Sequence, residues 1–177
     1  MNIVRERTAR STAATAESLQ FVTFEVGREE YGLVIRSIVE VIRPLPITQL
    51  PCMPQFVEGV INLRGRIIPV VDLRRRFNLT PASPGQRTAK ILIVRGAVPD
   101  AGAGRGLLGL VVDRVREVLH IPAASIEVAP EAARGNGADF IAGVAKAADR
   151  IIILLDITKV LSHTERAALA EVDDVHP

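Results

Sequence analysis

The sequence predicts a mainly β protein of two small β-barrels in tandem, with short helices between some of the strands. Three observations support this fold class. Apolar residues make up 48% of the 177 residues but aromatic residues only 3%, so the core consists of Val, Ile and Leu, most of them β-branched. The apolar runs are short and alternate with turns at regular spacing, which is typical of small barrels. One stretch of the chain also occurs twice, which indicates a structural unit used twice.

The repeat pairs FVEGVINLRGRIIPVVDLRRRF, residues 56–77, with FIAGVAKAADRIIILLDITKVL, residues 140–161. Upstream, GLVIRSIVEVIR parallels GLVVDRVREVLH. The first copy therefore covers about residues 32–77 and the second about residues 109–161, with an insertion inside the second. Residues that both copies keep are expected to serve the fold. Residues that only one copy has are candidates for function.

The first part of the chain is expected to hold an arm, a hairpin and a strand. Residues 1–18 are polar without useful periodicity, which indicates a mobile N-terminal arm. From Leu19, alternating apolar and polar residues interrupted by GREE predict a hairpin. A strand over SIVEVIR follows, because Pro44 excludes a helix there. Residues 47–59 are predicted to be a loop, with a single helical turn at residues 54–57.

A second hairpin is predicted around the turn NLRG, residues 62–65. Asn followed closely by Gly, between two apolar runs, is typical of a hairpin turn. Pro69 indicates an edge or a bulge in the next strand, because proline cannot donate a ladder hydrogen bond. Asp72 is well placed to cap a short helix over residues 73–77, and Asp156 precedes the same helical spacing in the second copy.

The second half is expected to repeat these elements with longer connections. A linker rich in Pro, Ser and Gly covers residues 80–87. Strands are predicted over residues 89–94 and 107–112, joined by a flexible turn, and VDRVREVLHIP mirrors the strand of the first copy. AASIEVAPEAARGNGAD is expected to be a long loop. Residues 157 to about 171 are predicted to form a terminal amphipathic helix.

The composition excludes several classes of protein. Cys52 is the only cysteine, which excludes an intramolecular disulfide and a Cys-rich metal site. The net charge is +2, and the one basic run, residues 74–76, is interpreted as a solvated helix face that is too short to predict nucleic-acid binding. No apolar run approaches the roughly 18 residues that span a bilayer, and the start lacks the apolar centre of a signal peptide. We therefore expect a cytoplasmic protein without direct membrane insertion.

No pattern in the sequence predicts catalysis or a cofactor. GRGLLG, residues 104–109, matches the dinucleotide fingerprint GxGxxG, but a strand rather than a helix follows it, so a hairpin turn is the better interpretation. The histidines are not at metal-ligand spacing; they are His120, His163 and His176. No nucleophile is accompanied by a base. The protein is expected to be no enzyme and to bind no metal or cofactor.

Two charged residues stand out because their neighbours are apolar, Glu40 in EVIR and Arg64 in the NLRG turn. Glu117 repeats Glu40 in the second copy, so an architectural role for this carboxylate stays open. Ala148 occupies the position of Arg64 in the second copy, which makes Arg64 the better functional candidate. The alternative is an exposed hairpin arginine without a function.

Taken together, these residues resemble the CheW family of coupling proteins in bacterial chemotaxis. The resemblance covers about residues 19–165 and is carried by EVIR, ITQLP, GLVVDRVREVL and, above all, NLRG followed by IIPVVDLR. It leaves residues 166–177 as a C-terminal tail. It implies two five-stranded SH3-like barrels and no catalytic activity. It further implies an adaptor that couples the cytoplasmic tips of chemoreceptors to the regulatory domain of the histidine kinase CheA, recruited to membrane-associated receptor arrays.

The resemblance also implies a receptor site. In the family, a receptor helix lies in an apolar groove between the barrels, near a glutamate and an arginine that fall here on Glu40 and Arg64. Ile38 is expected to line the same surface. The remaining residues of the turn complete the expected receptor site; they are Asn62, Leu63 and Gly65.

A different class of function stays open as an alternative, a small SH3-like barrel that binds RNA through its basic turns. The nearly balanced charge and the scarcity of aromatic residues for base stacking count against this alternative.

Overall fold

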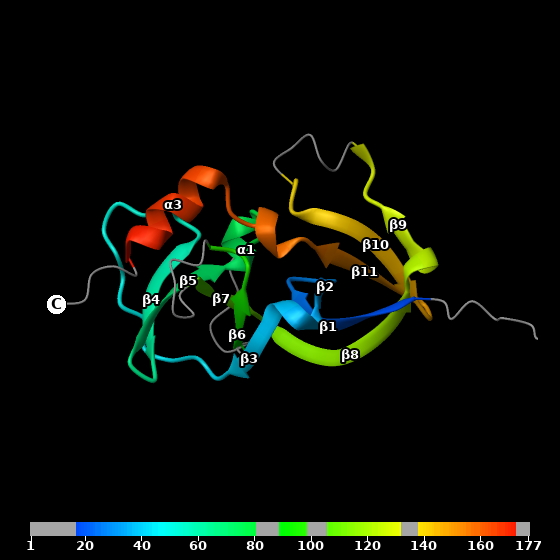
Figure 1. Cartoon of the computed structure of the whole chain (residues 1–177), viewed down its shortest axis with the longest axis horizontal. Coiled ribbons are helices and arrows are strands. Elements are labelled where there is room, and N and C mark those ends of the chain that lie inside the picture. The colour runs from blue at the N-terminus through cyan, green and yellow to red at the C-terminus, as the bar shows by residue number, and fades with distance from the viewer. Residues whose placement is uncertain (1–16, 81–88, 99–105, 132–137, 173–177) are drawn as a thin grey trace, which may run out of the picture.

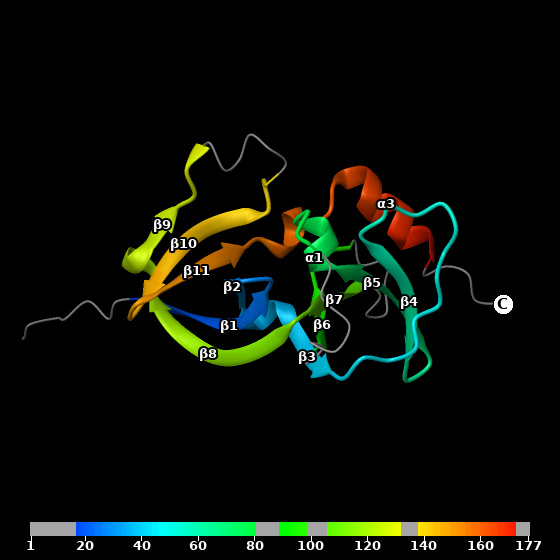
Figure 2. The same ribbon diagram turned by 180° about the vertical axis from the view of Figure 1, so that it is seen from behind.

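The computed structural model describes residues 17–80, 89–98, 106–131 and 138–172. The expected N-terminal arm and the linker after the first copy lie almost entirely outside these residues. Two β-sheets form two lobes that lie side by side (Figure 1, and from behind in Figure 2). The prediction of a mainly β protein is confirmed.

The strands of the larger sheet are β1 (Ser18–Val26), β2 (Glu29–Val34), β8 (Arg114–Pro122), β9 (Ile126–Val128), β10 (Ile141–Ala147) and β11 (Arg150–Leu155). The strands of the smaller sheet are β3 (Ile38–Ile42), β4 (Val57–Leu63), β5 (Arg66–Asp72), β6 (Lys90–Arg95) and β7 (Leu107–Val112). The helical elements are η1 (Ile35–Ser37), α1 (Leu73–Arg76), η2 (Ala123–Ser125), η3 (Ile157–Lys159) and α3 (His163–Val172). The six-stranded sheet has the order β8-β1-β2-β11-β10-β9, and the five-stranded sheet the order β3-β6-β7-β5-β4.

Each sheet contains strands of both copies of the repeat. The first copy begins in β2 of the six-stranded sheet and continues through β3, β4 and β5 of the five-stranded sheet. The second copy begins in β7 of the five-stranded sheet and continues through β8 to β11 of the other. A copy is therefore not a barrel. A two-stranded hairpin is only marginally stable alone, and here the β1–β2 hairpin lies between β8 and β11, two strands of the second copy.

Two parallel pairings join the copies, β2 with β11 and β5 with β7. Gly32 lies opposite Leu154 in the first, and Gly109 lies opposite Val70 at the equivalent place in the second. A Cβ atom on Gly32 would lie 3.0 Å from Leu154, and one on Gly109 would lie 3.2 Å from Val70. A larger residue would therefore press on the core at both places. The prediction that residues kept by both copies serve the fold is confirmed at these glycines.

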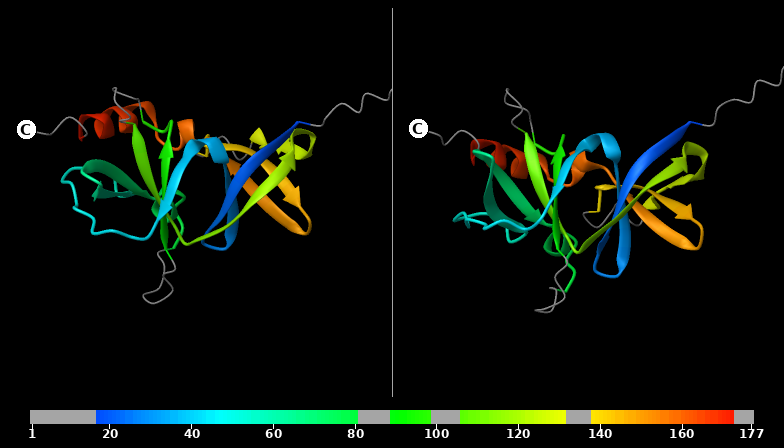
Figure 3. Two further views of the ribbon diagram at one scale, coloured as in Figure 1. Left: turned by 60° about the horizontal axis from the view of Figure 1, so that its bottom comes forward. Right: turned by 90° about the horizontal axis from the view of Figure 1, so that it is seen from below.

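Three hydrophobic clusters stabilise the two lobes. One belongs to the six-stranded sheet around Phe21 and Ile152, and another to the five-stranded sheet around Ile61 and Ile93. The third contains the most residues and combines side chains of both sheets, α1 and α3; its members include Phe24, Leu33, Leu92, Leu108 and Leu169. Two lobes that lie side by side (Figure 3) are therefore held together by a common core.

Four aromatic rings form a row in this common core. Phe24 stacks with Tyr31 at a centroid distance of 6.1 Å, and Phe77 lies 4.9 Å from Tyr31 on one side and 4.9 Å from Phe140 on the other. The guanidinium of Arg76 lies over Phe140 at 5.5 Å, and its Nε donates to the carbonyl of Val160 at 2.8 Å. The basic run 74–76 is thus not simply a solvated helix face, because Arg76 packs on aromatic rings.

Several local predictions are confirmed. The chain forms hairpins β1–β2 and β4–β5 where they were expected. Asp72 accepts a hydrogen bond from the Arg74 N–H at 2.8 Å, and Asp156 accepts one from the Thr158 N–H at 3.0 Å, so both aspartates cap the helical turn that follows. The prediction of an edge or a bulge at Pro69 is wrong, because β5 lies between β7 and β4 and the bulge of this hairpin lies between Val57 and Gly59. Proline is tolerated there because Pro69 lies one residue before the pairing of β5 with β7 begins, so its missing N–H interrupts no ladder on that side.

Other local predictions are corrected by the structure. The long loop after β8 contains η2 and the short strand β9, which pairs with β10. The expected terminal helix is two pieces, η3 and α3, because the chain leaves the helical path between them. In residues 54–57 the Val57 N–H donates to the Pro54 carbonyl at 2.9 Å, which closes a turn rather than a helix. Leu169 of α3 is only 2% exposed, so the packed structure continues beyond residue 165.

The repeated glycine Gly59 offers a test of these backbone constraints. It has a φ of +139°, and a Cβ atom there would lie 2.1 Å from the Thr48 carbonyl oxygen. We expect Gly59→Ala to lower the free energy of unfolding by roughly 3 kcal/mol, since both strain and overlap arise. Gly65 is the matched control, because it has a φ of +83° but nothing within 4 Å of a Cβ atom. Gly65→Ala should cost about 1 kcal/mol. Equal losses in chemical denaturation would contradict the role of the Thr48 contact.

Candidate functional site

The turn between β4 and β5 is a two-residue loop made of Arg64 and Gly65. Their φ angles are +53° and +83°, and Leu63 and Arg66 pair across the base of the loop. Positive φ at both central residues matches the right-handed twist of a hairpin. The Gly65 N–H donates to the Asn62 side-chain oxygen at 2.9 Å, which fixes the turn. The backbone therefore holds the Arg64 side chain at the tip of the hairpin.

Arg64 and Glu40, the two charged candidates, form a bidentate ion pair. The Nη1 and Nη2 atoms of Arg64 donate to the two carboxylate oxygens of Glu40 at 2.6 and 2.8 Å. The side chain of Arg64 is 72% exposed and that of Glu40 is 26% exposed. This pairing of two parallel hydrogen bonds is geometrically specific, and it leaves the other N–H groups of Arg64 directed to the surroundings.

The hydrogen bonds from Arg64 lower the pKa of Glu40, and the positive charge of the guanidinium adds to this effect. The same pair raises the pKa of Arg64. Glu40 lies on β3 and Arg64 next to β4, the first and last strands in the order of the five-stranded sheet. The pair therefore also links the first and last strands of this sheet.

The other residues expected in the site have mainly structural surroundings. Asn62 and Gly65 shape the turn through their shared hydrogen bond. Leu63 is partly buried against the cluster of the five-stranded sheet, and Ile38 is partly buried against the common core. Of the six residues expected at the receptor site, the structure thus presents Arg64, and to a smaller extent Glu40, as charged groups at the surface.

Two exposed valines beside Glu40 were not singled out by the sequence analysis. Val39 is 38% exposed and Val41 is 44% exposed, both on β3. Apart from Glu40, every residue of β3 is apolar, so periodicity did not distinguish the two valines from core residues. The signal that identifies them is the position of β3 at the end of its sheet, which depends on long-range pairing. The edge strand that carries Glu40 therefore also carries two exposed apolar side chains.

The second copy has a different arrangement at the equivalent place. Glu117, the counterpart of Glu40, accepts a hydrogen bond from Arg150 at 2.7 Å, and Arg150 also lies 3.2 Å from Glu30. Arg150 comes from strand β11 and not from the turn. The turn itself carries Ala148, with a φ of +53° that equals the φ of Arg64. Both copies thus keep a positive φ at the first residue of the turn and the glutamate, but only the first copy presents an arginine at the hairpin tip.

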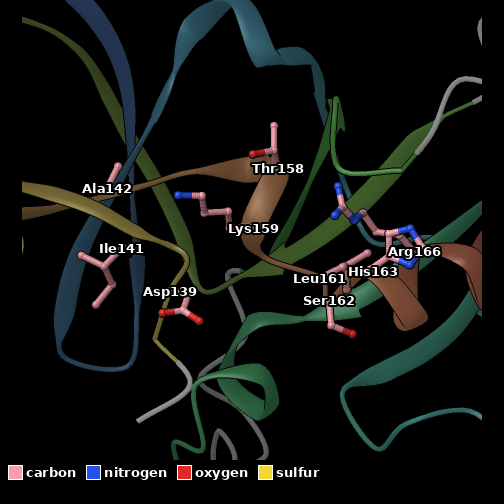
Figure 4. Close-up of a pocket in the computed structure, with 9 residues that line it drawn as sticks. All are labelled: Asp139, Ile141, Ala142, Thr158, Lys159, Leu161, Ser162, His163 and Arg166. Atoms are coloured by element: carbon pink, nitrogen blue, oxygen red, sulfur yellow. The ribbon is translucent and has the colours of Figure 1, made fainter. Parts of the chain in front are cut away.

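A surface pocket lies at the start of α3. Its volume is about 490 Å³, and it is lined by Asp139, Ile141, Ala142, Thr158, Lys159, Leu161, Ser162, His163 and Arg166. Figure 4 shows that Lys159 extends away from His163 and Arg166, so the basic side chains do not converge on one point. Ser162 and Glu165 satisfy each other's N–H groups at 3.2 and 2.6 Å as a capping box. The pocket therefore offers no assembled ligand site.

Within the described residues, no group of three or more His, Cys, Asp or Glu side chains is placed to hold a metal ion. Within the same part of the chain, no helix is both long and apolar enough to cross a membrane. Of the histidines, His120 on β8 contacts the side chain of Gln20 at 2.7 Å, His163 begins α3, and His176 lies outside the described residues. The strand expected after the glycine-rich motif is present as β7. The first two residues of the motif, Gly104 and Arg105, lie outside the described residues.

The chain is similar to known proteins over most of its length. The family model described as CheW-like domain matches residues 20–165. A chemotaxis protein CheW of Klebsiella aerogenes is 33% identical over 169 residues, which cover 96% of this chain and 97% of that protein. A chemotaxis protein CheW of Treponema pallidum is 32% identical over 160 residues, which cover 90% and 92%. A crystal structure of a scaffolding protein, TtCheW from Thermoanaerobacter tengcongensis, superposes with a TM-score of 0.71 at 35% identity and covers 84% of this chain and 96% of that one.

The ion pair makes a prediction about titration. In Arg64→Ala the main cause of the lowered pKa of Glu40 is removed, so we expect that pKa to rise toward the ordinary range of a glutamate. The backbone should tolerate the change, because Ala148 has the same φ of +53°. NMR titration of the Glu40 carboxyl carbon measures the shift, and Arg64→Lys is the control that keeps the charge. An unchanged titration of Glu40 in Arg64→Ala would show that the pair does not persist in solution.

The Glu40–Arg64 pair also predicts the direction in which the stability of the protein changes with pH. Because the pKa of Glu40 is lowered in the folded protein, the contribution of the pair to stability is present above the unfolded-state pKa. It is lost as the pH falls through the folded-state pKa. The stability difference between wild type and Arg64→Ala should therefore shrink in acid, as chemical denaturation at several pH values would measure.

Proposed function

The chain belongs to the CheW-like domain family of chemotaxis scaffold proteins, and from this premise we propose that it couples chemoreceptors to the histidine kinase CheA. In this role it has no catalytic activity of its own. It joins the cytoplasmic tip of a receptor to the regulatory domain of the kinase, and it acts in the cytoplasm at membrane-associated receptor arrays. The names of the relatives, chemotaxis and scaffolding proteins, support this class of function.

The observation that carries the proposal is the asymmetry of the repeat at Arg64. The two copies share a positive φ at the first residue of the turn and a glutamate, but only the first presents an arginine there. A residue that the fold does not require, and that is 72% exposed at a fixed hairpin tip, is suited to contact a partner. We therefore assign the receptor site to Glu40, Arg64 and the exposed apolar side chains of the edge strand β3.

The chemistry of this surface fits an amphipathic helix. Val39 and Val41 offer apolar contact, at 38% and 44% exposure, for the apolar face of such a helix. Arg64 offers charge-assisted hydrogen bonds to acceptors at the edge of that face. Glu40 orients the guanidinium, because its two oxygens already hold two of the nitrogen atoms. In this site Glu40 is a positioning residue and Arg64 the contact residue.

Binding of RNA through basic turns has less support from the side chains. The basic run 74–76 would be its most obvious surface, but Arg74 is only 19% exposed and Arg76 packs over Phe56 and Phe140. Arg75 lies 3.3 Å from Glu58. These guanidinium groups are thus engaged within the protein and are poorly placed to contact phosphates.

Co-sedimentation with receptor-containing membranes and kinase tests the proposal. Wild type should join the complex, while Arg64→Ala should lose about tenfold in receptor affinity and keep kinase binding, because a charge-assisted contact is removed. Lys146→Ala is the matched control, since Lys146 is an exposed cation of the second copy, 69% exposed and paired with Glu127 at 3.4 Å. Circular dichroism monitors the fold of each variant.

The outcomes separate the alternatives. Normal receptor binding by Arg64→Ala would make Arg64 only a hairpin arginine and would overturn the site. Failure of wild type to bind either partner would overturn the coupling role. Retention by nucleic acid that falls steeply with added salt would favour RNA binding instead, whereas docking of an apolar helix face should depend only weakly on salt.

A further inference from the structure

The chain crosses between the two sheets twice, once in each copy. The first crossing leads from β2 through η1 to β3, and the second leads from β7 to β8. Asp113 is the single residue between β7 and β8, so it stands where the chain leaves the five-stranded sheet for the six-stranded one. Because of this position, side-chain contacts of Asp113 can influence the orientation of one sheet relative to the other.

The Asp113 carboxylate contacts both sheets. It accepts a hydrogen bond at 2.7 Å from the Gly27 N–H, in the turn of the β1–β2 hairpin. It also accepts from the Arg74 Nε at 2.8 and 2.9 Å, and lies 2.7 Å from Arg74 Nη2. Arg74 belongs to α1, which directly follows β5 of the five-stranded sheet. One carboxylate thus ties the hairpin turn of one sheet to the helix that ends a strand of the other.

The pair is held in place and shielded. The side chains of Arg74 and Asp113 are only 19% and 25% exposed, so solvent weakens their attraction less than at an open surface. The Arg74 N–H is capped by Asp72 at 2.8 Å, and the Arg74 Nη1 donates to the Thr80 carbonyl at 2.8 Å. The hydrogen bonds with Asp113 raise the pKa of Arg74. The guanidinium therefore occupies a single well-defined position.

Only one of the two crossings has this arrangement. The counterpart of Asp113 in the first copy is Arg36, which reverses the charge. The counterpart of Arg74 in the second copy is Thr158, whose hydroxyl donates to Asp156 within its own turn at 2.6 Å. The other copy thus folds without an arginine–aspartate pair at these positions, so the pair is not among the residues that both copies need.

We propose that Arg74 and Asp113 form a latch, together with the Gly27 N–H, that sets the orientation of one sheet relative to the other. The common hydrophobic core holds the sheets together but is non-directional, whereas a bidentate charge-assisted contact fixes direction. If one barrel surface meets the receptor and another meets the kinase, the latch sets the angle between the two partners. This last step rests on the proposed function, while the latch itself does not.

Distances between spin labels test the latch without any partner. The native Cys52 is exposed in the loop between β3 and β4, and Val128→Cys adds a second label on β9 of the other sheet, where the side chain is 72% exposed. We expect Arg74→Gln to broaden the distribution of distances between the labels and to leave the β-sheet circular dichroism unchanged. Arg74→Lys keeps the charge and should restore most of the narrow distribution.

Arg75→Gln is the matched control. Arg75 lies on the same short helix, but its ion pairs are with Glu58 at 3.3 Å and Asp72 at 3.8 Å, within the five-stranded sheet. In Arg75→Gln the distribution of distances between the two spin labels should stay as narrow as in wild type. A wild-type distribution in Arg74→Gln, or equal broadening in Arg75→Gln, would overturn the latch. If Arg74→Gln fails to fold, Asp113→Asn is measured with the same two labels instead. A broader distribution of distances than in wild type and Arg75→Gln supports the latch, and an unchanged distribution overturns it.

A second measurement addresses the consequence for assembly. With the kinase regulatory domain and a receptor tip fragment, Arg74→Gln should bind each partner alone about as well as wild type but should lose the complex of all three. Normal assembly of all three together with a broadened label distribution would overturn this consequence and leave the latch standing. Failure of wild type to bind either partner would instead overturn the proposed coupling function, and the label distances would still test the latch.

Discussion

The hydrophobic core between the two sheets is the constraint on which the rest of the structure depends. Neither copy of the repeat can complete a sheet alone, because the β1–β2 hairpin lies between strands of the second copy and the β6–β7 hairpin between strands of the first. Burial of Phe24, Leu92 and their neighbours then makes the exchange of hairpins favourable. It follows that the two lobes fold as one unit and that a change in one copy is felt in both sheets.

A nearly symmetric framework carries an asymmetric surface. Both copies keep the glycines of the parallel junctions, the capping aspartates and a glutamate on the strand after the crossing. The departures from symmetry include charged residues, Arg64 at a hairpin tip and Arg74 with Asp113 at a crossing. The fold accepts other residues at the equivalent positions of the other copy. A partner would therefore meet different side chains on the two lobes. In a duplicated unit of this kind, the residues that both copies share maintain the fold, and residues that only one copy has are free to take part in binding.

The sequence predicts the local features of this protein well and the long-range ones less well. Hairpins, the NLRG turn and the aspartate caps follow from a few neighbouring residues. Only the resemblance to the family placed Glu40 and Arg64 near one site, and their ion pair was not predicted. The exchange of strands between the copies was not predicted, because it depends on pairings between distant segments that no local pattern encodes. For the same reason the partners of Arg74 and Arg76 and the exposure of Val41 could be found only in the folded chain.

The most direct test of the account is to map where a receptor tip fragment binds, by NMR on wild-type protein with labelled arginine and valine side chains. We expect the signals of Arg64, Val39 and Val41 to move on addition of the fragment, while those of Arg150 and Val118, in the second copy, stay in place. Movement of the second-copy signals with those of Arg64 unchanged would contradict it, because a residue that only the first copy has would then play no part in recognition.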